Sequence, residues 1–336
     1  SEMCIRDRAS VANAQLMGIV SLLAIASAFF AVLLYRLLYS RRQTDFFGAL
    51  PVTRQTEYLA KTLSVALVIL STYITAGIGL LLLKVVIPAK FHVSVDVGYC
   101  LRAMVVSLAA SFAFYCIAQL CAVTAGKLWQ YWTLLIGIGI CFPSGIMVYL
   151  SAIPTFLPGI PKSAVNFGAL CTPLFMVPLS TEHTFRFRVL ILCGIFIAAA
   201  AYLLGAYLFS KRSNECAEHT VSSQVVSTLA VCGAALCVVD IPGILPLKRN
   251  MYLLYAAIAV LAMAAVSVIC TLIYHRKVLT KATGIQLCVL SVVVFGTIAL
   301  LGSDAFGYRD AVPDLQEVES VSAVSYTHLR AHETPE

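Results

Sequence analysis

Ala103–Gly126 reads AMVVSLAASFAFYCIAQLCAVTAG, a run of 24 residues without a charged side chain. An α-helix needs about 20 apolar residues to cross the hydrocarbon core of a bilayer, which is roughly 30 Å thick. A charged side chain at the centre of that core costs roughly 2.5–3.5 kcal/mol on insertion scales, so spanning helices exclude charge there. This stretch therefore predicts a transmembrane α-helix.

Runs of the same kind recur along the chain. Eight of them are long enough to cross a membrane, which predicts an all-α fold, a polytopic transmembrane helical bundle of about eight spanning helices. The eight runs are Ala9–Tyr35, Thr62–Leu83, Ala103–Gly126, Leu128–Pro161, Val189–Ser210, Thr220–Val239, Asn250–Tyr274 and Ala282–Ser303.

The composition excludes a soluble globular protein. Hydrophobic residues make up 60% of the 336 residues and charged residues 12%, whereas soluble domains carry about 25% charged residues. The length would allow two soluble domains, but too few polar side chains are present to cover their surfaces. The net charge of +7 fits basic cytoplasmic loops, and the sequence lacks the clustered basic runs that bind nucleic acid.

Twelve cysteines are present, but their spacing indicates neither a metal site nor a disulfide framework. No CxxC pair and no Cys/His ligand spacing occurs. We expect the cysteines within the apolar runs to be small, buried side chains that stay reduced. These are Cys116, Cys121, Cys141, Cys193, Cys232, Cys237, Cys270 and Cys288.

A proline-rich segment follows the fourth run. Ser163–Thr181 is uncharged and nearly long enough to span, but it contains Pro173 and Pro178, and proline breaks helices. Irregular backbone at membrane depth persists only where protein or water surrounds it. A re-entrant or extracellular element is therefore the favoured prediction, and a ninth crossing is the open alternative.

The two ends differ in character from residues 9–303, the predicted transmembrane domain. Residues 1–8 (SEMCIRDR) and 324–336 (VSYTHLRAHETPE) resemble translated sequencing-adapter sequence, so both are expected to be artefactual and are set apart from the fold. Residues 304–323 are polar and acidic. They predict the start of an extracellular domain that is truncated here.

A polar island, Tyr39–Arg54 (YSRRQTDFFGALPVTR), separates the first two runs. Thr44 and Asp45 can cap a short helix there, because their side-chain oxygens can accept hydrogen bonds from free N-terminal amides. Pro51 would end that helix at Leu50, since the residue before a proline disfavours the helical conformation. The island therefore predicts a short helix between two spans.

The apolar side chains of this short helix would share one face. Phe46, Phe47 and Leu50 stand at positions i, i+1 and i+4, and Arg54 with Glu57 would open the next helix. A short amphipathic helix can lie against lipid at the membrane surface. It can equally insert its Phe pair into a groove on a partner protein, and the residues alone leave both possibilities open.

The distribution of Lys and Arg predicts which side of the membrane the island faces. Five basic residues surround the first loop, whereas the next loop and its far end hold three. Cytoplasmic loops carry the excess of Lys and Arg, so residues 39–57 are expected in the cytoplasm. The two groups are Arg36, Arg41, Arg42, Arg54 and Lys61, and Lys84, Lys90 and Arg102.

The sequence contains no motif for ATP hydrolysis or for zinc catalysis. The GxxxxGK[ST] phosphate loop and the HExxH motif are both missing, which predicts a protein that is not an enzyme and holds no cofactor of its own. Gln119 is among the few strongly polar side chains deep in a predicted span. It can bond across helices or face a translocation path, because polar groups within membrane helices often mark such paths.

The island resembles the loop of bacterial ABC transporter permeases of the type-2 exporter class. In that class a helix of similar size precedes a Leu-Pro-(Val/Ile)-(Ser/Thr/Lys)-Arg turn, which Leu50-Pro-Val-Thr-Arg54 matches. Gly307–Asp314 (GYRDAVPD) and Val318–Val321 (VESV) are similar to the start of the extracellular domain in a Firmicutes subgroup of these permeases. The resemblance covers roughly residues 14–323, and the family's first span is expected to be missing.

The resemblance implies a transporter subunit that takes its energy from another protein. A separate ATP-binding-cassette ATPase subunit would bind ATP, and two permease subunits would form one complex in the bacterial plasma membrane. The cargo would be a hydrophobic or lipid-like substrate or a drug. An ion-coupled secondary transporter, an intramembrane enzyme, and a non-transporting sensor or structural protein remain as alternatives. Docking of the ATPase is implied for Asp45, Phe46, Phe47, Leu50, Pro51 and Arg54.

Overall fold

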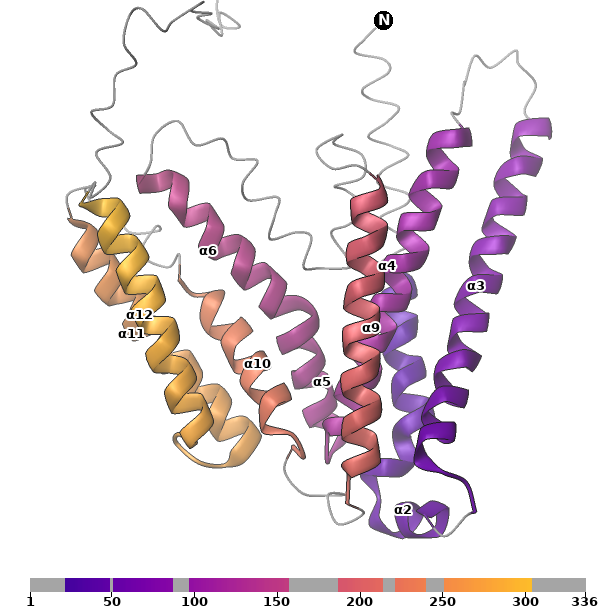
Figure 1. Ribbon diagram of the computed structural model, residues 1–336, viewed down its shortest axis with the longest axis horizontal. Helices are drawn as coiled ribbons and strands as arrows, with labels where there is room; N and C mark the ends of the chain where they lie inside the picture. Colours follow the sequence, from indigo (N-terminus) through magenta and orange to yellow (C-terminus); the bar gives the residue numbers. More distant parts are fainter. Residues whose placement is uncertain are drawn as a thin grey trace, which may run out of the picture.

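The computed structural model describes residues 22–48, 51–86, 97–156, 187–213, 221–239 and 251–303 (Figure 1). Every regular element in these ranges is a helix. A first helix covers residues 22–35. It is followed by η1 (Arg36–Tyr39), α2 (Arg41–Gly48), α3 (Arg54–Val86), α4 (Val97–Thr124), α5 (Leu128–Ile136), η3 (Gly137–Cys141), α6 (Phe142–Phe156), α9 (Phe187–Lys211), α10 (Gln224–Leu236), α11 (Tyr252–His275) and α12 (Lys281–Gly302).

Seven helical segments in the described residues are long and apolar enough to cross a bilayer, which confirms an all-α, multi-pass helical bundle. They coincide with seven of the eight predicted runs. The remaining run, Thr220–Val239, holds α10, whose 13 residues extend about 20 Å at 1.5 Å per residue. Because this is shorter than the hydrocarbon core, the count of eight spans stays a prediction. Ser163–Thr181 and the segments 1–8 and 304–336 lie outside the described residues.

The outward faces of the long helices are apolar. Phe196 on α9, Leu261 on α11 and Val292 on α12 are each at least 70% exposed. A helix that is hydrophobic all round is stable when hydrocarbon surrounds it. These faces are therefore the surfaces that contact lipid in a membrane.

α4 lies at the centre of the N-terminal group of helices. In its membrane-crossing window 72% of the residues are buried, against 11–33% in the other six windows. Its closest neighbour is α9. A Cβ atom on Gly194 of α9 would lie 3.2 Å from the Cβ of Ala109 on α4, so small residues allow the two backbones to approach closely.

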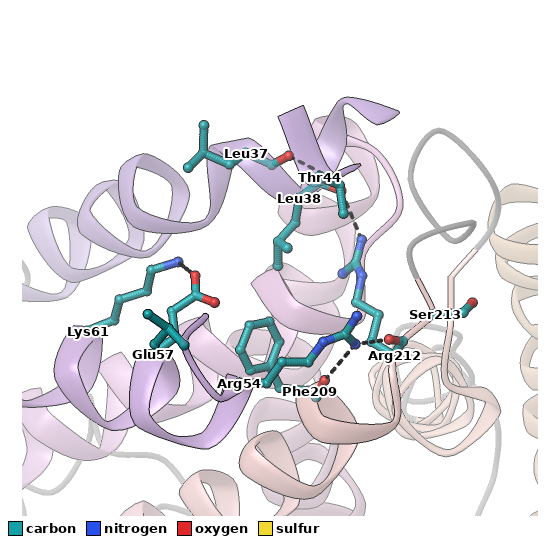
Figure 2. A pocket seen from close by; sticks show the side chains of 10 residues that line it. Leu37, Leu38, Thr44, Arg54, Glu57, Lys61, Phe209, Arg212 and Ser213 are labelled. Carbon is teal, nitrogen blue, oxygen red and sulfur yellow. Dashed lines mark hydrogen bonds and ion pairs between the residues drawn. The ribbon is translucent and has the colours of Figure 1, made fainter. Parts of the chain in front are cut away.

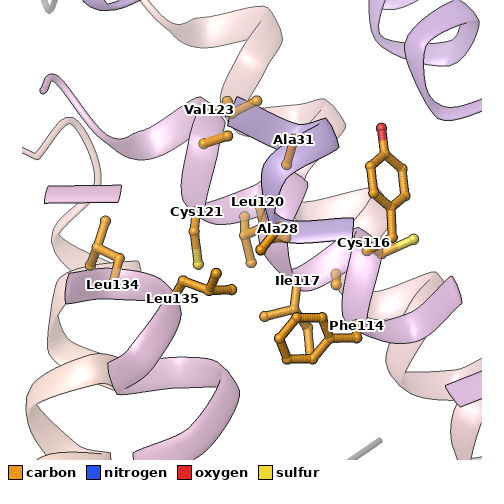
Figure 3. Packing of buried hydrophobic residues seen from close by; sticks show 14 of the residues in the cluster. Ala28, Ala31, Phe114, Cys116, Ile117, Leu120, Cys121, Val123, Leu134 and Leu135 are labelled. Carbon is orange, nitrogen blue, oxygen red and sulfur yellow. The ribbon is translucent and has the colours of Figure 1, made fainter. Parts of the chain in front are cut away.

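Apolar side chains of the first helix and α5 pack against those of α4 in one cluster (Figure 3). Ala28 and Ala31 of the first helix pack in the same cluster as Leu120 of α4. Cys116 and Cys121 are buried in this cluster, as predicted. All eight cysteines in the described residues are free thiols, but the expectation that they are all buried is wrong: five are only partly buried and Cys288 is exposed.

A second group of helices, α6, α10, α11 and α12, lies beside the first (Figure 1). α5, η3 and α6 form one continuous span that contacts α4 at its start and α10 along its length. The contact with α10 depends on glycine. A Cβ on Gly233 would lie 2.5 Å from the Cα of Phe142, and one on Gly145 would lie 2.5 Å from the Cβ of Leu236.

α2 lies at one end of the bundle (Figure 1). The helix termini and connections at this end carry most of the basic residues. Eleven of the fourteen Lys and Arg residues in the described ranges are at this end, and three are at the opposite end. The eleven are Arg36, Arg41, Arg42, Arg54, Lys61, Lys127, Lys211, Arg212, Arg276, Lys277 and Lys281, and the three are Lys84, Arg102 and Arg188.

Candidate functional site

α2 begins earlier than the sequence predicted. It covers Arg41–Gly48 and follows the 3-10 turn η1, so Thr44 lies within the helix rather than at its N-cap. The backbone amide of Thr44 donates to Ser40 O at 3.0 Å, and its hydroxyl donates to Leu37 O at 3.0 Å and to Ser40 O at 2.9 Å. The predicted capping role of Thr44 and Asp45 is therefore wrong, because both residues lie inside α2. The buried hydroxyl of Thr44 instead fastens α2 to the preceding turn.

The residues predicted to dock a partner fall in and after α2. Asp45, Phe46 and Phe47 belong to the second half of α2, and Leu50 lies outside the described residues. Pro51 is exposed in the turn that follows. Their docking role stays a prediction.

Arg54 is the first residue of α3, and Glu57 lies in its first turn, which confirms the predicted start of that helix. Glu57 receives a hydrogen bond from the Lys61 ammonium at 2.6 Å. The same ammonium lies 4.5 Å from the ring centroid of Tyr35, within the range of a cation–π contact. This cluster joins the first turns of α3 to the end of the first helix.

A pocket opens beside α2 where η1, α2, α3 and α9 meet (Figure 2). It encloses about 600 Å³ when its open mouth is included. Its lining combines apolar, basic, acidic and hydroxyl side chains. The lining residues are Leu37, Leu38, Thr44, Val52, Arg54, Glu57, Lys61, Phe209, Arg212 and Ser213.

Two guanidinium groups in this pocket bind backbone carbonyls at helix ends. The Nη1 atom of Arg54 donates to Phe209 O at 3.4 Å and to Arg212 O. The last carbonyls of a helix have no partner within the helix, so Arg54 satisfies the C-terminal end of α9. A cation is also favoured there by the helix dipole.

Arg212 is the second of these groups, and only 5% of it is exposed. Its Nη2 donates to Leu38 O in η1 at 3.0 Å, and its Nη1 donates to Val123 O near the end of α4. No motif in the sequence singles out Arg212. Its position became apparent only from contacts between distant parts of the chain.

Gln119 of α4 forms hydrogen bonds with side chains of the first helix and α3. Its Nε2 donates to the Tyr35 hydroxyl at 2.6 Å and to Thr62 Oγ1 at 2.8 Å. The side chain is fully buried, which agrees with the interhelical alternative for this residue. A role in a translocation path stays a prediction.

Aromatic rings fill the space between this polar cluster and α9. The ring of Tyr58 lies 5.3 Å from that of Tyr202 and 5.8 Å from that of Phe209, measured between centroids. Tyr35 meets Phe209 edge-on at 6.0 Å. The C-terminal part of α9 is therefore held against both α3 and the first helix.

The described side chains do not assemble a metal site: within these ranges no three His, Cys, Asp or Glu residues are grouped to bind an ion. The chemistry of the site is recognition of backbone carbonyls by two arginines, of which Arg212 is buried and Arg54 is partly exposed. Comparison of the chain with protein-family models, with curated proteins and with solved structures found no match.

Proposed function

We propose that this chain is the membrane permease subunit of an ATP-binding-cassette exporter. It would move a hydrophobic or lipid-like substrate or a drug across the bacterial plasma membrane, with energy from a separate ATPase subunit. A second permease subunit, identical or related, would complete the complex. The observation that carries the proposal is a short surface helix, α2, tied to the spans at the basic end of a multi-pass bundle.

The charge distribution supports a cytoplasmic position for α2. Basic residues are enriched on the cytoplasmic side of membrane proteins, and eleven of the fourteen described Lys and Arg residues share the end where α2 lies. An ATPase that binds cytoplasmic ATP would meet the chain on this side.

The attachment of α2 supports a mechanical role. Thr44 bonds it to η1, and η1 continues directly from the first helix. A short helix that is fixed at its base and carries two consecutive Phe residues, Phe46 and Phe47, suits insertion into a groove of a partner. Closure of the ATPase pair would then move α2, and the spans would shift between inward-facing and outward-facing arrangements.

A pull-down experiment tests this function. The full-length gene is expressed with its neighbouring ATPase gene, and the ATPase retained by the tagged permease is measured. Phe46→Asp with Phe47→Asp should abolish retention, because two carboxylates cannot enter an apolar groove unpaired.

Gln43→Asp with Gln55→Asp is the matched control. It adds two carboxylates at exposed positions on either side of the docking segment, and retention should persist. Intact assembly and ATP-coupled transport in the Phe double variant would refute the docking role. Transport driven by an ion gradient without any ATPase would instead favour a secondary carrier.

A further inference from the structure

We infer that Arg212 and Arg54 are positioning residues that transmit movement of α2 to the ends of α4 and α9. This inference rests on the proposed function, because it requires a partner that moves α2. It concerns the contacts that Arg54 and Arg212 make with backbone carbonyls of the bundle, which involve neither Phe46 nor Phe47. Arg54 is also one of the residues that the resemblance implies for docking.

Arg212 joins three segments that are far apart in sequence. It follows α9 directly, and its two terminal nitrogens donate to Leu38 O in η1 and to Val123 O near the end of α4. η1 is the turn to which Thr44 fastens α2. Movement of α2 therefore reaches η1 first, and through Arg212 it reaches α4 and α9 together.

Arg54, at the start of α3, binds the end of α9 next to Arg212. Its Nη1 bonds Phe209 O and Arg212 O, so the backbone that carries Arg212 is itself held by the first residue of α3. Figure 2 shows the Arg54 guanidinium bonded to the carbonyls of Phe209 and Arg212, while the Arg212 guanidinium turns toward η1. Arg54 is only three residues beyond Pro51. Movement of α2 would therefore also reach the bonds of Arg54 to Phe209 and Arg212 through the segment that connects α2 to α3.

The chemistry requires arginine at position 212. The planar guanidinium group presents several N–H donors in a fixed fork, whereas a lysine ammonium is a compact group on a flexible stem. One arginine can therefore bridge two carbonyls on separate helices and hold them at a fixed separation. Hydrogen bonds in which the donor is charged are also roughly twice as strong as neutral ones.

The neighbouring cation provides a natural contrast. Lys211 is exposed, and its ammonium donates to the Tyr207 hydroxyl of the same helix at 2.5 Å. It carries the same charge as Arg212 at the adjacent position. Lys211→Gln therefore removes one positive charge from this end of the bundle without touching the bridge.

The test is amide hydrogen exchange on the complex of the full-length permease with its neighbouring ATPase. Exchange is compared with and without a non-hydrolysable ATP analogue for the segments 120–124 and 205–213. The wild type and Lys211→Gln should show a nucleotide-dependent change in both segments. Arg212→Gln should hold the ATPase but lose that change, and permease-dependent stimulation of ATP hydrolysis should fall about tenfold, which is within the usual range of coupling between sites.

If Arg212→Gln does not fold, the same exchange measurement is made on Arg212→Lys. It keeps the charge but cannot bridge both carbonyls, so its nucleotide-dependent change should be smaller than that of the wild type. An unaltered change in the Arg212 variants, or no change in the wild-type complex, would overturn the transmission role while leaving the proposed function intact. If the wild-type permease does not bind its neighbouring ATPase, both the transmission role and the proposed function are refuted.

Discussion

Gln119→Leu should destabilise the bundle, because it removes the amide that joins the first helix, α3 and α4. Leucine has a similar size, so the change removes hydrogen bonds while leaving packing nearly unaltered. The amide donates to the Tyr35 hydroxyl at 2.6 Å and to Thr62 Oγ1 at 2.8 Å, and all three side chains are buried.

The two partners should contribute unequally to the loss. The Tyr35 hydroxyl would be left buried without its amide partner, and an unsatisfied buried polar group costs about 1–3 kcal/mol. Thr62 keeps its bond to Tyr58 O at 2.8 Å, so its share should be closer to about 0.6 kcal/mol, the average for interhelical hydrogen bonds in a membrane protein. The free energy of unfolding should therefore fall by about 2 kcal/mol.

A double-mutant cycle with Tyr35→Phe tests this reasoning, because Tyr35→Phe should lower the free energy of unfolding of the wild type but raise that of Gln119→Leu. Tyr35→Phe alone should cost about 0.6 kcal/mol, because Gln119 retains Thr62. Added to Gln119→Leu, the same change should restore about 1 kcal/mol of the free energy of unfolding, since it removes the Tyr35 hydroxyl that was left without a partner. A purely additive loss would contradict this reasoning.

The assay is reversible unfolding in mixed detergent micelles, followed by circular dichroism. Thr72→Val is the control, because Thr72 is exposed and its hydroxyl donates to Val68 O of its own helix. Its effect should stay within about 0.5 kcal/mol. If Gln119→Leu is as stable as Thr72→Val, the hydrogen-bonded cluster does not support the bundle.

Two further perturbations test other contacts. Gly233→Ala should cost about 1–3 kcal/mol, because its Cβ would lie 2.5 Å from the backbone of Phe142; Gly79→Ala, which meets open space, should be neutral or stabilising by up to about 1 kcal/mol. The same unfolding assay compares them, and equal effects would contradict the close packing of α10. Thr44→Val should loosen α2 and speed tryptic cleavage beside it several-fold, whereas Gln43→Ala, at an exposed position, should leave the cleavage rate unchanged; equal rates would show that the Thr44 bonds do not hold α2.

The spans could be predicted because the membrane imposes a simple condition on sequence. Charged residues are excluded over about 20 residues. Each of the seven long apolar helices in the described residues overlaps one of the uncharged runs found in the sequence, such as Ala103–Gly126. The start of α3 could also be predicted, since Pro51 disfavours helix at the residue before it and Arg54 with Glu57 suits a first turn. Hydropathy could not give the length of α10, because an apolar run reports environment and not where a helix ends.

The contacts at the candidate site could not be predicted from local rules. A Thr before an apolar segment favours an N-cap, but the turn η1 presents the carbonyl of Leu37 to the Thr44 hydroxyl. Nothing in the local sequence distinguishes Arg212 from Lys211. The distinction arises from carbonyls 89 and 174 residues away along the chain, those of Val123 and Leu38.

The most direct measurement is site-specific photo-crosslinking in intact cells. A benzophenone amino acid replaces Phe46 or Phe47 on α2 or, as a control, the exposed residue Leu101 at the opposite end of the bundle. If α2 docks the energy-supplying subunit, irradiation should join the ATPase to positions 46 and 47 and leave position 101 unlinked. Recovery of the ATPase from position 101, or of no ATPase from either α2 position, would contradict the proposed docking.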